Sequence, residues 1–325
     1  MKNKILKWIG LAIASMLTPL CMSCNGSSDN GKLKIVTTIF PEYDWVMNII
    51  GEQKANIDVT MLLDSGVDLH SYSPTPKDIV TISHCDLFIY VGGESDEWTE
   101  DVLKTANNKK MEVINLMTVL GDGAKEEEII DGMEGEEEEE EEGEEEVEYD
   151  EHVWLSVKNA ELFVNTICRS IASLDKENAA YYTANAATYV TNLKALDAEY
   201  SAAVSQGKQK TILFADRFPF RYLVEDYSLK YYAAFVGCSA ATAASFETIK
   251  FLAGKVDELG LKVILKIEDS DGKIAEAVKN ATTNKNQTIL VMDSIQSATT
   301  KEYESGRNYL SIMQKNLTVL KEALQ

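Results

Sequence analysis

Residues 175–204 read DKENAAYYTANAATYVTNLKALDAEYSAAV and are predicted to form one long helix. The stretch is rich in Ala, begins with an Asp that can cap a helix, and contains neither Pro nor Gly. A helix of this length extends about 45 Å at 1.5 Å per residue, which exceeds the width of one small domain. We therefore predict a rigid connecting helix, residues 175–206, that joins two lobes.

Strands and helices are predicted to alternate on both sides of this helix. Four apolar, β-branched runs before it predict strands at residues 34–38, 56–63, 86–91 and 112–116. Four more follow it, at residues 211–215, 231–236, 262–267 and 288–292. This alternation favours mainly parallel sheets covered on both faces. The expected fold is α/β, with lobes at residues 33–174 and 207–325 and a ligand cleft between them.

A strongly acidic segment interrupts the first lobe. Residues 126–151 contain 18 Asp or Glu and no Lys or Arg, and the formal net charge of the whole chain is -22. Self-repulsion and low hydrophobicity predict a solvated, disordered loop over residues 121–150. The sequence shows no clustered basic surface of the kind that binds nucleic acid.

The first residues resemble a secretory signal. Three lysines precede a short apolar run at residues 8–17, which is too short to cross a bilayer as a stable helix. Ser23 and Cys24 then match the end of a bacterial lipoprotein signal, although Cys21 departs from the usual Leu. We expect a signal peptide at residues 1–23, a lipid on Cys24 that anchors the protein outside the cytoplasm, and a flexible tether at residues 24–32. Plain secretion without a lipid is the alternative.

The residues that could bind a metal follow the predicted strands. His70 comes after the second strand, and His152 directly follows the acidic segment. Asp216, Glu268 and Asp293 each follow a strand of the second lobe. Such loops gather at one edge of a parallel sheet, and imidazole nitrogen and carboxylate oxygen both suit zinc, whereas oxygen suits manganese. Each residue alone has an ordinary alternative: a carboxylate can cap a helix, and a histidine can lie on the surface by chance.

The other signals point away from catalysis and disulfides. No HExxH, GxSxG, GxxxxGK[ST] or GxGxxG motif is present, so we predict that the protein is not an enzyme. Cys85, Cys168 and Cys238 form no CxxC pair, and buried free thiols are expected for the first two. His84 lies beside an apolar strand and is expected to be structural.

Several motifs along nearly the whole chain carry a resemblance to a known family. They are IVTTIFPEYDWVMNIIG (35–51), GVDLHSYSPTPKDI (66–79), DLFIYVGGESDEW (86–98), EHVWLSVKNA (151–160), LDKENAAYYTANAATYVTNL (174–193) and YLSIMQKNLTVLKEAL (309–324). With these motifs the chain resembles the metal-specific solute-binding proteins of bacterial ABC transporters, the zinc and manganese lipoprotein group. The resemblance implies two α/β lobes bridged by a long helix, with one metal ion in the cleft.

The resemblance also implies the metal ligands. They fall on His70, His152, Asp216 and Asp293, with Glu268 in reserve. The third ligand is the hardest to place. The family has His or Glu at this position, and counting back from residues 220–222 places the position on Arg217. Arg cannot bind a metal, and counting forward from the strand reaches Asp216 instead.

The expected function is capture of Zn²⁺, with Mn²⁺ as the alternative. Two histidines and two carboxylates make an oxygen-rich site, which favours manganese. A long charged loop at the place of the acidic segment is typical of zinc-specific members, and such a loop also attracts divalent cations by its charge. The resemblance implies a monomer that delivers the metal to a membrane permease driven by its ATPase. A metal-dependent hydrolase or a surface adhesin on the same fold are the alternatives from other classes.

Overall fold

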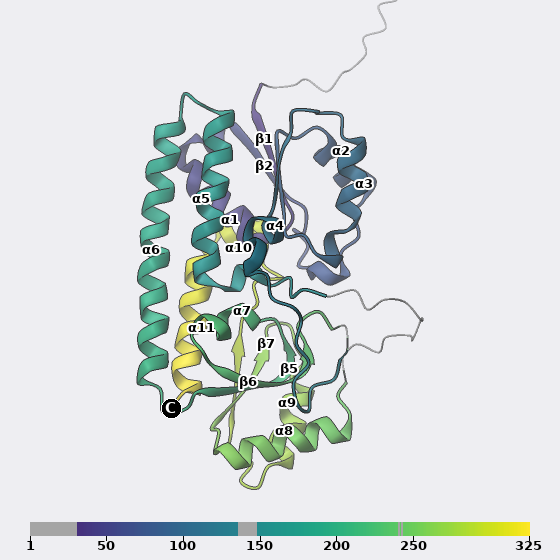
Figure 1. Ribbon diagram of the computed structural model, residues 1–325, viewed down its shortest axis with the longest axis vertical. Coiled ribbons are helices and arrows are strands. Elements are labelled where there is room, and N and C mark those ends of the chain that lie inside the picture. Colours follow the sequence, from purple (N-terminus) through teal and green to yellow (C-terminus); the bar gives the residue numbers. More distant parts are fainter. Residues whose placement is uncertain (1–30, 136–147, 240, 242) are drawn as a thin grey trace, which may run out of the picture. The chain divides into compact units, whose positions relative to one another are not determined.

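Two four-stranded parallel sheets organise the described part of the chain (Figure 1). The structure is a computed structural model that describes residues 31–135, 148–239, 241 and 243–325, and residues 33–325 form one compact unit. The predicted α/β fold with two lobes is confirmed. The predicted signal peptide, Cys24 and most of the tether lie outside the described residues. Within those residues, no helix is long and apolar enough to cross a membrane.

The first lobe is built on a sheet with the strand order β2-β1-β3-β4. Its strands are β1 (Leu33–Thr37), β2 (Ile57–Met61), β3 (Leu87–Tyr90) and β4 (Glu112–Asn115). Its helices are α1 (Phe40–Ile50), α2 (Pro76–Ser83), α3 (Trp98–Thr105) and α4 (Leu116–Leu120). Every residue of β3 is buried, which is why this strand reads as an uninterrupted apolar run rather than an alternating one.

The second lobe is built on a sheet with the strand order β6-β5-β7-β8. Its strands are β5 (Thr211–Phe218), β6 (Lys230–Val236), β7 (Val263–Ile267) and β8 (Thr288–Met292). Its helices are α7 (Arg221–Asp226), α8 (Phe246–Leu259) and α9 (Lys273–Ala281), whereas α10 (Thr300–Glu304) follows β8 in the sequence but packs against α1 of the first lobe through Tyr303. β5 is longer than predicted, because the strand resumes its pairing with β6 at Arg217 after an irregularity that follows Phe214. Asp216 and Arg217 therefore belong to the strand rather than to the loop after it.

The long helix α6 (Ala179–Gln206) runs beside both lobes, with α5 (Val157–Leu174) next to the first lobe and α11 (Tyr309–Ala323) next to the second (Figure 1). α6 begins four residues later than predicted, because Asp175 ends α5 and accepts a hydrogen bond from Tyr182 (2.6 Å). Further along α6, Tyr189 donates to Asp44 of α1 (2.7 Å), and Tyr200 donates to the carbonyl of Met313 in α11 (2.7 Å). The connecting helix is thus fixed to both lobes by buried side chains.

The acidic segment is ordered at both of its ends. Glu126 pairs with Tyr149 in an antiparallel bridge, and Glu134 forms a parallel bridge to β6. Apolar side chains between the charged residues pack on the main core, and this packing offsets the repulsion between the carboxylates. The prediction from sequence considers only the repulsion. The prediction of disorder over residues 121–150 is therefore wrong for these ends, whereas residues 136–147 lie outside the described part.

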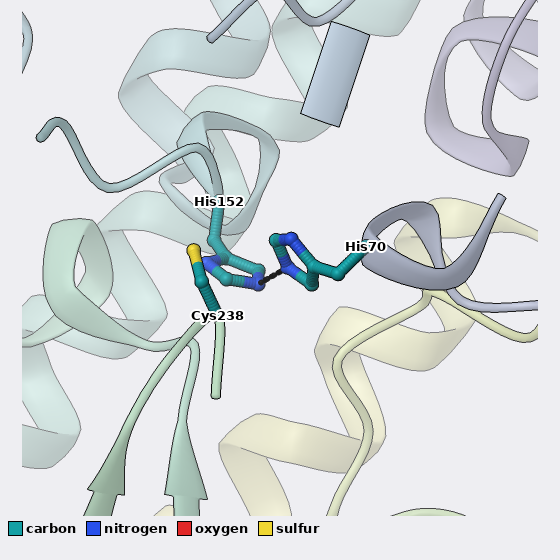
Figure 2. Close-up of side chains that lie close together, drawn as sticks. All are labelled: His70, His152 and Cys238. Carbon is teal, nitrogen blue, oxygen red and sulfur yellow. Dashed lines mark hydrogen bonds between the residues drawn. The ribbon is translucent and has the colours of Figure 1, made fainter. Parts of the chain in front are cut away.

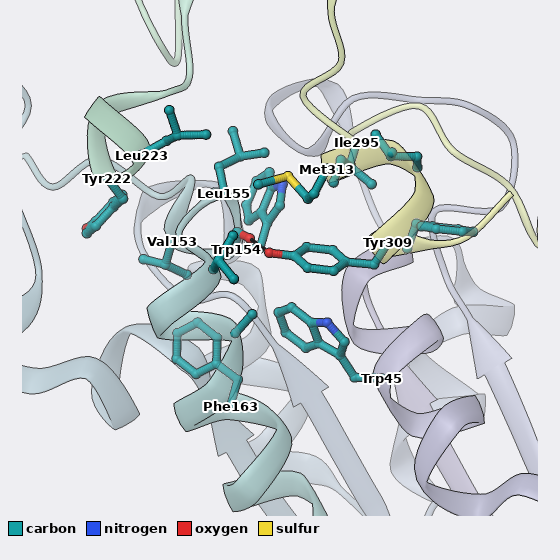
Figure 3. Close-up of a cluster of buried hydrophobic side chains, with 14 of the residues drawn as sticks. Trp45, Val153, Trp154, Leu155, Phe163, Tyr222, Leu223, Ile295, Tyr309 and Met313 are labelled. Atoms are coloured by element: carbon teal, nitrogen blue, oxygen red, sulfur yellow. Dashed lines mark hydrogen bonds between the residues drawn. The ribbon is translucent and has the colours of Figure 1, made fainter. Parts of the chain in front are cut away.

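A buried aromatic cluster supports the backbone that follows His152 (Figure 3). Trp154 is fully buried, and its indole N–H donates to the carbonyl of Ser294 in the second lobe (2.9 Å). Tyr309 of α11 donates to the Trp154 carbonyl (2.7 Å), and its ring packs edge-on against Trp45 of α1. Trp154 and Tyr309 are large buried aromatic side chains whose polar atoms are hydrogen-bonded, and such side chains give a rigid support. The position of His152 is therefore set by residues from both lobes.

Candidate metal centre

His70 lies on a short turn after β2, and its imidazole is held at Nδ1. Asp68 accepts a hydrogen bond from the backbone N–H of His70 (3.0 Å), which fixes the turn. Nδ1 of His70 lies 2.8 Å from the Ser95 hydroxyl and 3.5 Å from a carboxylate oxygen of Glu151. Burial, together with the neighbouring His152, lowers the pKa of His70 to about 3. The ring is therefore neutral at pH 7, which is the form that binds metals.

His152 is held in the same manner by the residue two positions before it. Asp150 Oδ1 accepts from the backbone N–H of His152 (2.8 Å) and lies 3.0 Å from its Nδ1. His152 is fully buried and Asp150 is 2% exposed. A carboxylate accepts only, so Nδ1 of His152 is the donor in this contact. The Asp150 carboxylate therefore holds a proton on Nδ1 and leaves Nε2 available.

The two free nitrogens face each other. Nε2 of His70 lies 3.1 Å from Nε2 of His152 (Figure 2). Zinc binds imidazole nitrogen at about 2.0–2.1 Å, so two nitrogens on one tetrahedral ion lie about 3.3 Å apart. The observed separation matches two ligands of one ion. The structure thus brings together the two histidines that the sequence singled out, and their role as ligands is taken up below as a proposal.

Cys238 lies beside the histidine pair, just after the end of β6 (Figure 2). Among the described residues, the only group of three or more His, Cys, Asp and Glu side chains with ligand atoms within 4.8 Å of one another is His70, His152 and Cys238. Cys238 is a half-buried free thiol, and burial raises its pKa well above the ordinary value. Sequence reasoning missed it, although its position after a strand of the second lobe was the same signal that selected the carboxylates.

The three predicted carboxylates do not join this group. Asp216 accepts from two backbone N–H groups, and Asp293 makes an ion pair with Arg307 (2.6 Å). Glu268 accepts from both the backbone N–H (2.6 Å) and the hydroxyl (2.7 Å) of Ser294. The expectation that they meet the histidines is wrong for this structure, because each already has partners within its own lobe.

Two residues that sequence reasoning did not select stand close to the pair. Arg217 makes an ion pair with Asp68 across the lobes. Burial raises the pKa of Asp68, but Arg217, His70 and the hydrogen bonds that they donate to the carboxylate together hold that pKa below its usual value. Gln296 is buried after β8, with its amide nitrogen 2.7 Å from Asp68 and its amide oxygen 3.2 Å from Nε2 of His152. These contacts link the second lobe to the turn that carries His70.

A cavity of about 1460 Å³ opens onto His70 and Cys238. Three basic side chains line it, and they are Lys125, Arg217 and Arg221. Nine carboxylates also line it, and they are Glu94, Glu97, Asp122, Glu126, Glu127, Glu128, Glu148, Glu151 and Glu225. The ordered ends of the acidic segment supply five of them. The wall is therefore strongly negative, and such a wall attracts cations toward the histidines.

Comparison with known proteins identifies the family. The profile described as zinc-uptake complex component A, periplasmic (ZnuA), matches residues 35–323. The chain belongs to this family. It is 31% identical to the zinc-binding protein AdcA of Streptococcus pyogenes over 325 residues, which cover 99% of this chain and 61% of AdcA. It is 30% identical to the high-affinity zinc uptake system protein ZnuA of Bacillus subtilis over 327 residues, which cover 98% of each chain.

A solved structure with the same fold carries zinc. The Zn(II)-bound ZnuA-like domain of Streptococcus pneumoniae AdcA superposes with a TM-score of 0.70 and 27% identity, over 90% of this chain and 99% of that domain. The chain thus corresponds to a whole domain there, while it spans about three fifths of the length of the AdcA proteins it matches. The resemblance drawn from the sequence motifs is confirmed by these matches.

Proposed function

We propose that this protein captures Zn²⁺ outside the cytoplasm and delivers it to an ABC permease. The carrying observation is the pair of buried imidazoles, His70 and His152, whose Nε2 atoms face each other at 3.1 Å, within hydrogen-bond distance. Each Nδ1 contacts a polar partner, so both rings are oriented before a metal arrives. Relatives of this chain are named for zinc binding and zinc uptake, which supports zinc as the cargo.

The mechanism needs capture and release, and no covalent step. The neutral imidazole of His70 binds the ion without first losing a proton, which suits a site that loads from dilute metal. The connecting helix α6 is fixed to both lobes, so we expect small shifts between them when the metal binds or leaves. Transfer then requires a membrane partner, which we take to be the permease and its ATPase. We expect a monomer, held at the membrane by a lipid on Cys24.

The acidic segment has a supporting role in this proposal. Its ordered ends line the cavity in front of the histidines, and its charge raises the local concentration of divalent cations. Attraction by exposed carboxylates is screened by salt, with a Debye length of about 8 Å at 0.15 M ionic strength. The segment therefore gathers cations weakly, and the histidine site selects among them.

The test is elemental analysis of the full chain purified without chelator, followed by competition between zinc and manganese. We expect one tightly bound zinc per chain. His70→Ala and His152→Ala should each lower zinc affinity by more than the roughly 10- to 100-fold that is typical for outer-sphere partners. The matched control is His84→Ala, because His84 is exposed and its Nδ1 contacts only the carbonyl of Val80. Unchanged zinc affinity in both site variants would refute the proposal.

The alternatives make different predictions. Preference for manganese in the competition would replace zinc with Mn²⁺ as the cargo. A metal-dependent hydrolase would need an open coordination position and a general base, and would show turnover that His152→Ala abolishes. A surface adhesin would bind a host or cell-wall partner equally well with and without metal.

A further inference from the structure

We propose that Cys238 supplies a thiolate ligand to the metal held by His70 and His152. This inference rests on the proposed function and adds a donor from the second lobe. The ligand atoms of the three residues all lie within 4.8 Å of one another. Zinc binds thiolate sulfur at about 2.3 Å and imidazole nitrogen at about 2.0–2.1 Å, so one ion reaches all three after small side-chain shifts.

The backbone before Cys238 is shaped to bring this loop against His152. A Cβ at Gly237 would lie 2.9 Å from Cε1 of His152 and 3.0 Å from the carbonyl oxygen of Phe218. Neither neighbour can move freely, because the imidazole is buried and the carbonyl belongs to a strand. Glycine therefore permits a close approach that any side chain would prevent. The thiol of the next residue is delivered to the histidines by this approach.

The charges around the thiol also favour a cation. Burial raises the pKa of the Cys238 thiol, and the carboxyl groups of Glu127, Asp150 and Glu151 raise it further, so a divalent cation is needed to stabilise the thiolate here. Glu151 is 2% exposed and lines the cavity, and its Oε2 accepts no hydrogen bond. A buried carboxylate oxygen without a donor is costly, and a divalent cation nearby lowers that cost. Glu151 thus points independently to a positive ligand at this place.

Among the described residues of the second lobe, Cys238 is the only His, Cys, Asp or Glu that is grouped with the two histidines within 4.8 Å. Arg217 stands beside His70, but a guanidinium cannot bind a metal and it is paired with Asp68. Asp216 and Asp293 are occupied within their own lobe. Cys238 therefore gives the site its donor from the second lobe, and it changes the donor set from oxygen-rich to nitrogen and sulfur. Such a set suits zinc and disfavours manganese.

Cobalt(II) bound to the full chain tests the inference directly. We expect thiolate-to-cobalt charge-transfer absorption in the near ultraviolet, and we expect Cys238→Ala to abolish it. The matched control is Cys168→Ala, because Cys168 is a buried free thiol outside the cavity. A Cys21→Ser, Cys24→Ser double variant should keep the absorption, which excludes a contribution from the N-terminal thiols.

Zinc affinity provides a second readout. Cys238→Ala should weaken zinc binding by more than about 100-fold, since outer-sphere changes alone cost about 10- to 100-fold. In the unaltered chain, zinc should slow alkylation of Cys238 by a maleimide, a measurement that needs no variant. The inference about Cys238 would be overturned if zinc binding depends on His70 but the chain shows neither charge-transfer absorption nor protection of Cys238 by zinc. That result would leave the proposed function standing. A chain that binds neither zinc nor cobalt would overturn both.

Discussion

Replacing Asp150 tests whether a buried carboxylate sets the imidazole that we propose as a metal ligand. Oδ1 of Asp150 accepts from the backbone N–H of His152 at 2.8 Å and contacts its Nδ1 at 3.0 Å. In Asp150→Asn the amide oxygen stays in this place, because the backbone N–H still requires an acceptor. The hydrogen bond to Nδ1 then loses its charge but keeps its geometry. In Asp150→Ala both hydrogen bonds are lost.

The size of the effect follows from these two contacts. A hydrogen bond to a charged group contributes about 1.5–3 kcal/mol and a neutral one about 0.5–1.5 kcal/mol. The difference for Asp150→Asn is about 1–1.5 kcal/mol, or about a 10-fold loss of zinc affinity at 1.4 kcal/mol per factor of ten. Asp150→Ala frees the ring to rotate and should cost about 100-fold, the upper end for an outer-sphere partner.

The assay is competition for zinc against a chelator of known affinity, at fixed pH and ionic strength. Asp44→Asn is the matched control, because Asp44 is fully buried and accepts a hydrogen bond from Tyr189 (2.7 Å), yet it does not line the cavity. Its zinc affinity should equal that of the unaltered chain. Folded Asp150→Asn and Asp150→Ala proteins that both bind zinc within about twofold of the unaltered chain would show that the carboxylate does not orient His152.

Three further predictions follow from individual side chains. Burial raises the pKa of Asp44 from 3.8 to about 7 in the folded chain. The protonated carboxyl therefore contributes to the free energy of unfolding below pH 3.8, and this contribution is lost as pH rises through 7. Asp44→Asn should remove up to about 4 kcal/mol of this pH dependence, measured by denaturant unfolding at several pH values. Asp216→Ala should leave zinc affinity within about threefold in chelator competition, because that carboxylate binds backbone N–H groups instead. Cys238→Asp should shift the zinc-to-manganese affinity ratio toward manganese by at least about tenfold in direct competition, since a hard oxygen replaces a soft sulfur.

The two-lobed fold was predictable because its signals are local. Each strand is an apolar run of ordinary length, and α6 has no residue that would break it. The ordered ends of the acidic segment were not predictable from charge. Glu134 is held there by a backbone contact to Ala234 and by the N–H of Ser245, and both partners lie about one hundred residues away in the sequence. Contacts of this kind leave no pattern in the segment itself.

The histidine pair was predictable and the donors of the second lobe were not. His70 and His152 stand in motifs whose neighbours serve the same site, as Asp150 does for His152. Asp293 follows β8 as expected, but its carboxylate meets Arg307, a residue from the segment between α10 and α11. Sequence position gives the edge of a sheet at which a side chain emerges. It does not give the partner that the side chain meets there.

The resemblance places a family ligand position on Arg217, and this departure fits our proposal that the donor from the second lobe comes from Cys238, just after β6. A site built from His70 and His152 alone would hold its ion by the first lobe only, and lobe shifts would not affect release. The guanidinium of Arg217 cannot fill the gap, but its pair with Asp68 removes most of its repulsion toward a cation. Cys238, one strand further along the same sheet, can then approach the histidines. The departure at Arg217 thus changes which strand supplies the donor, while the sheet edge that forms the site is kept.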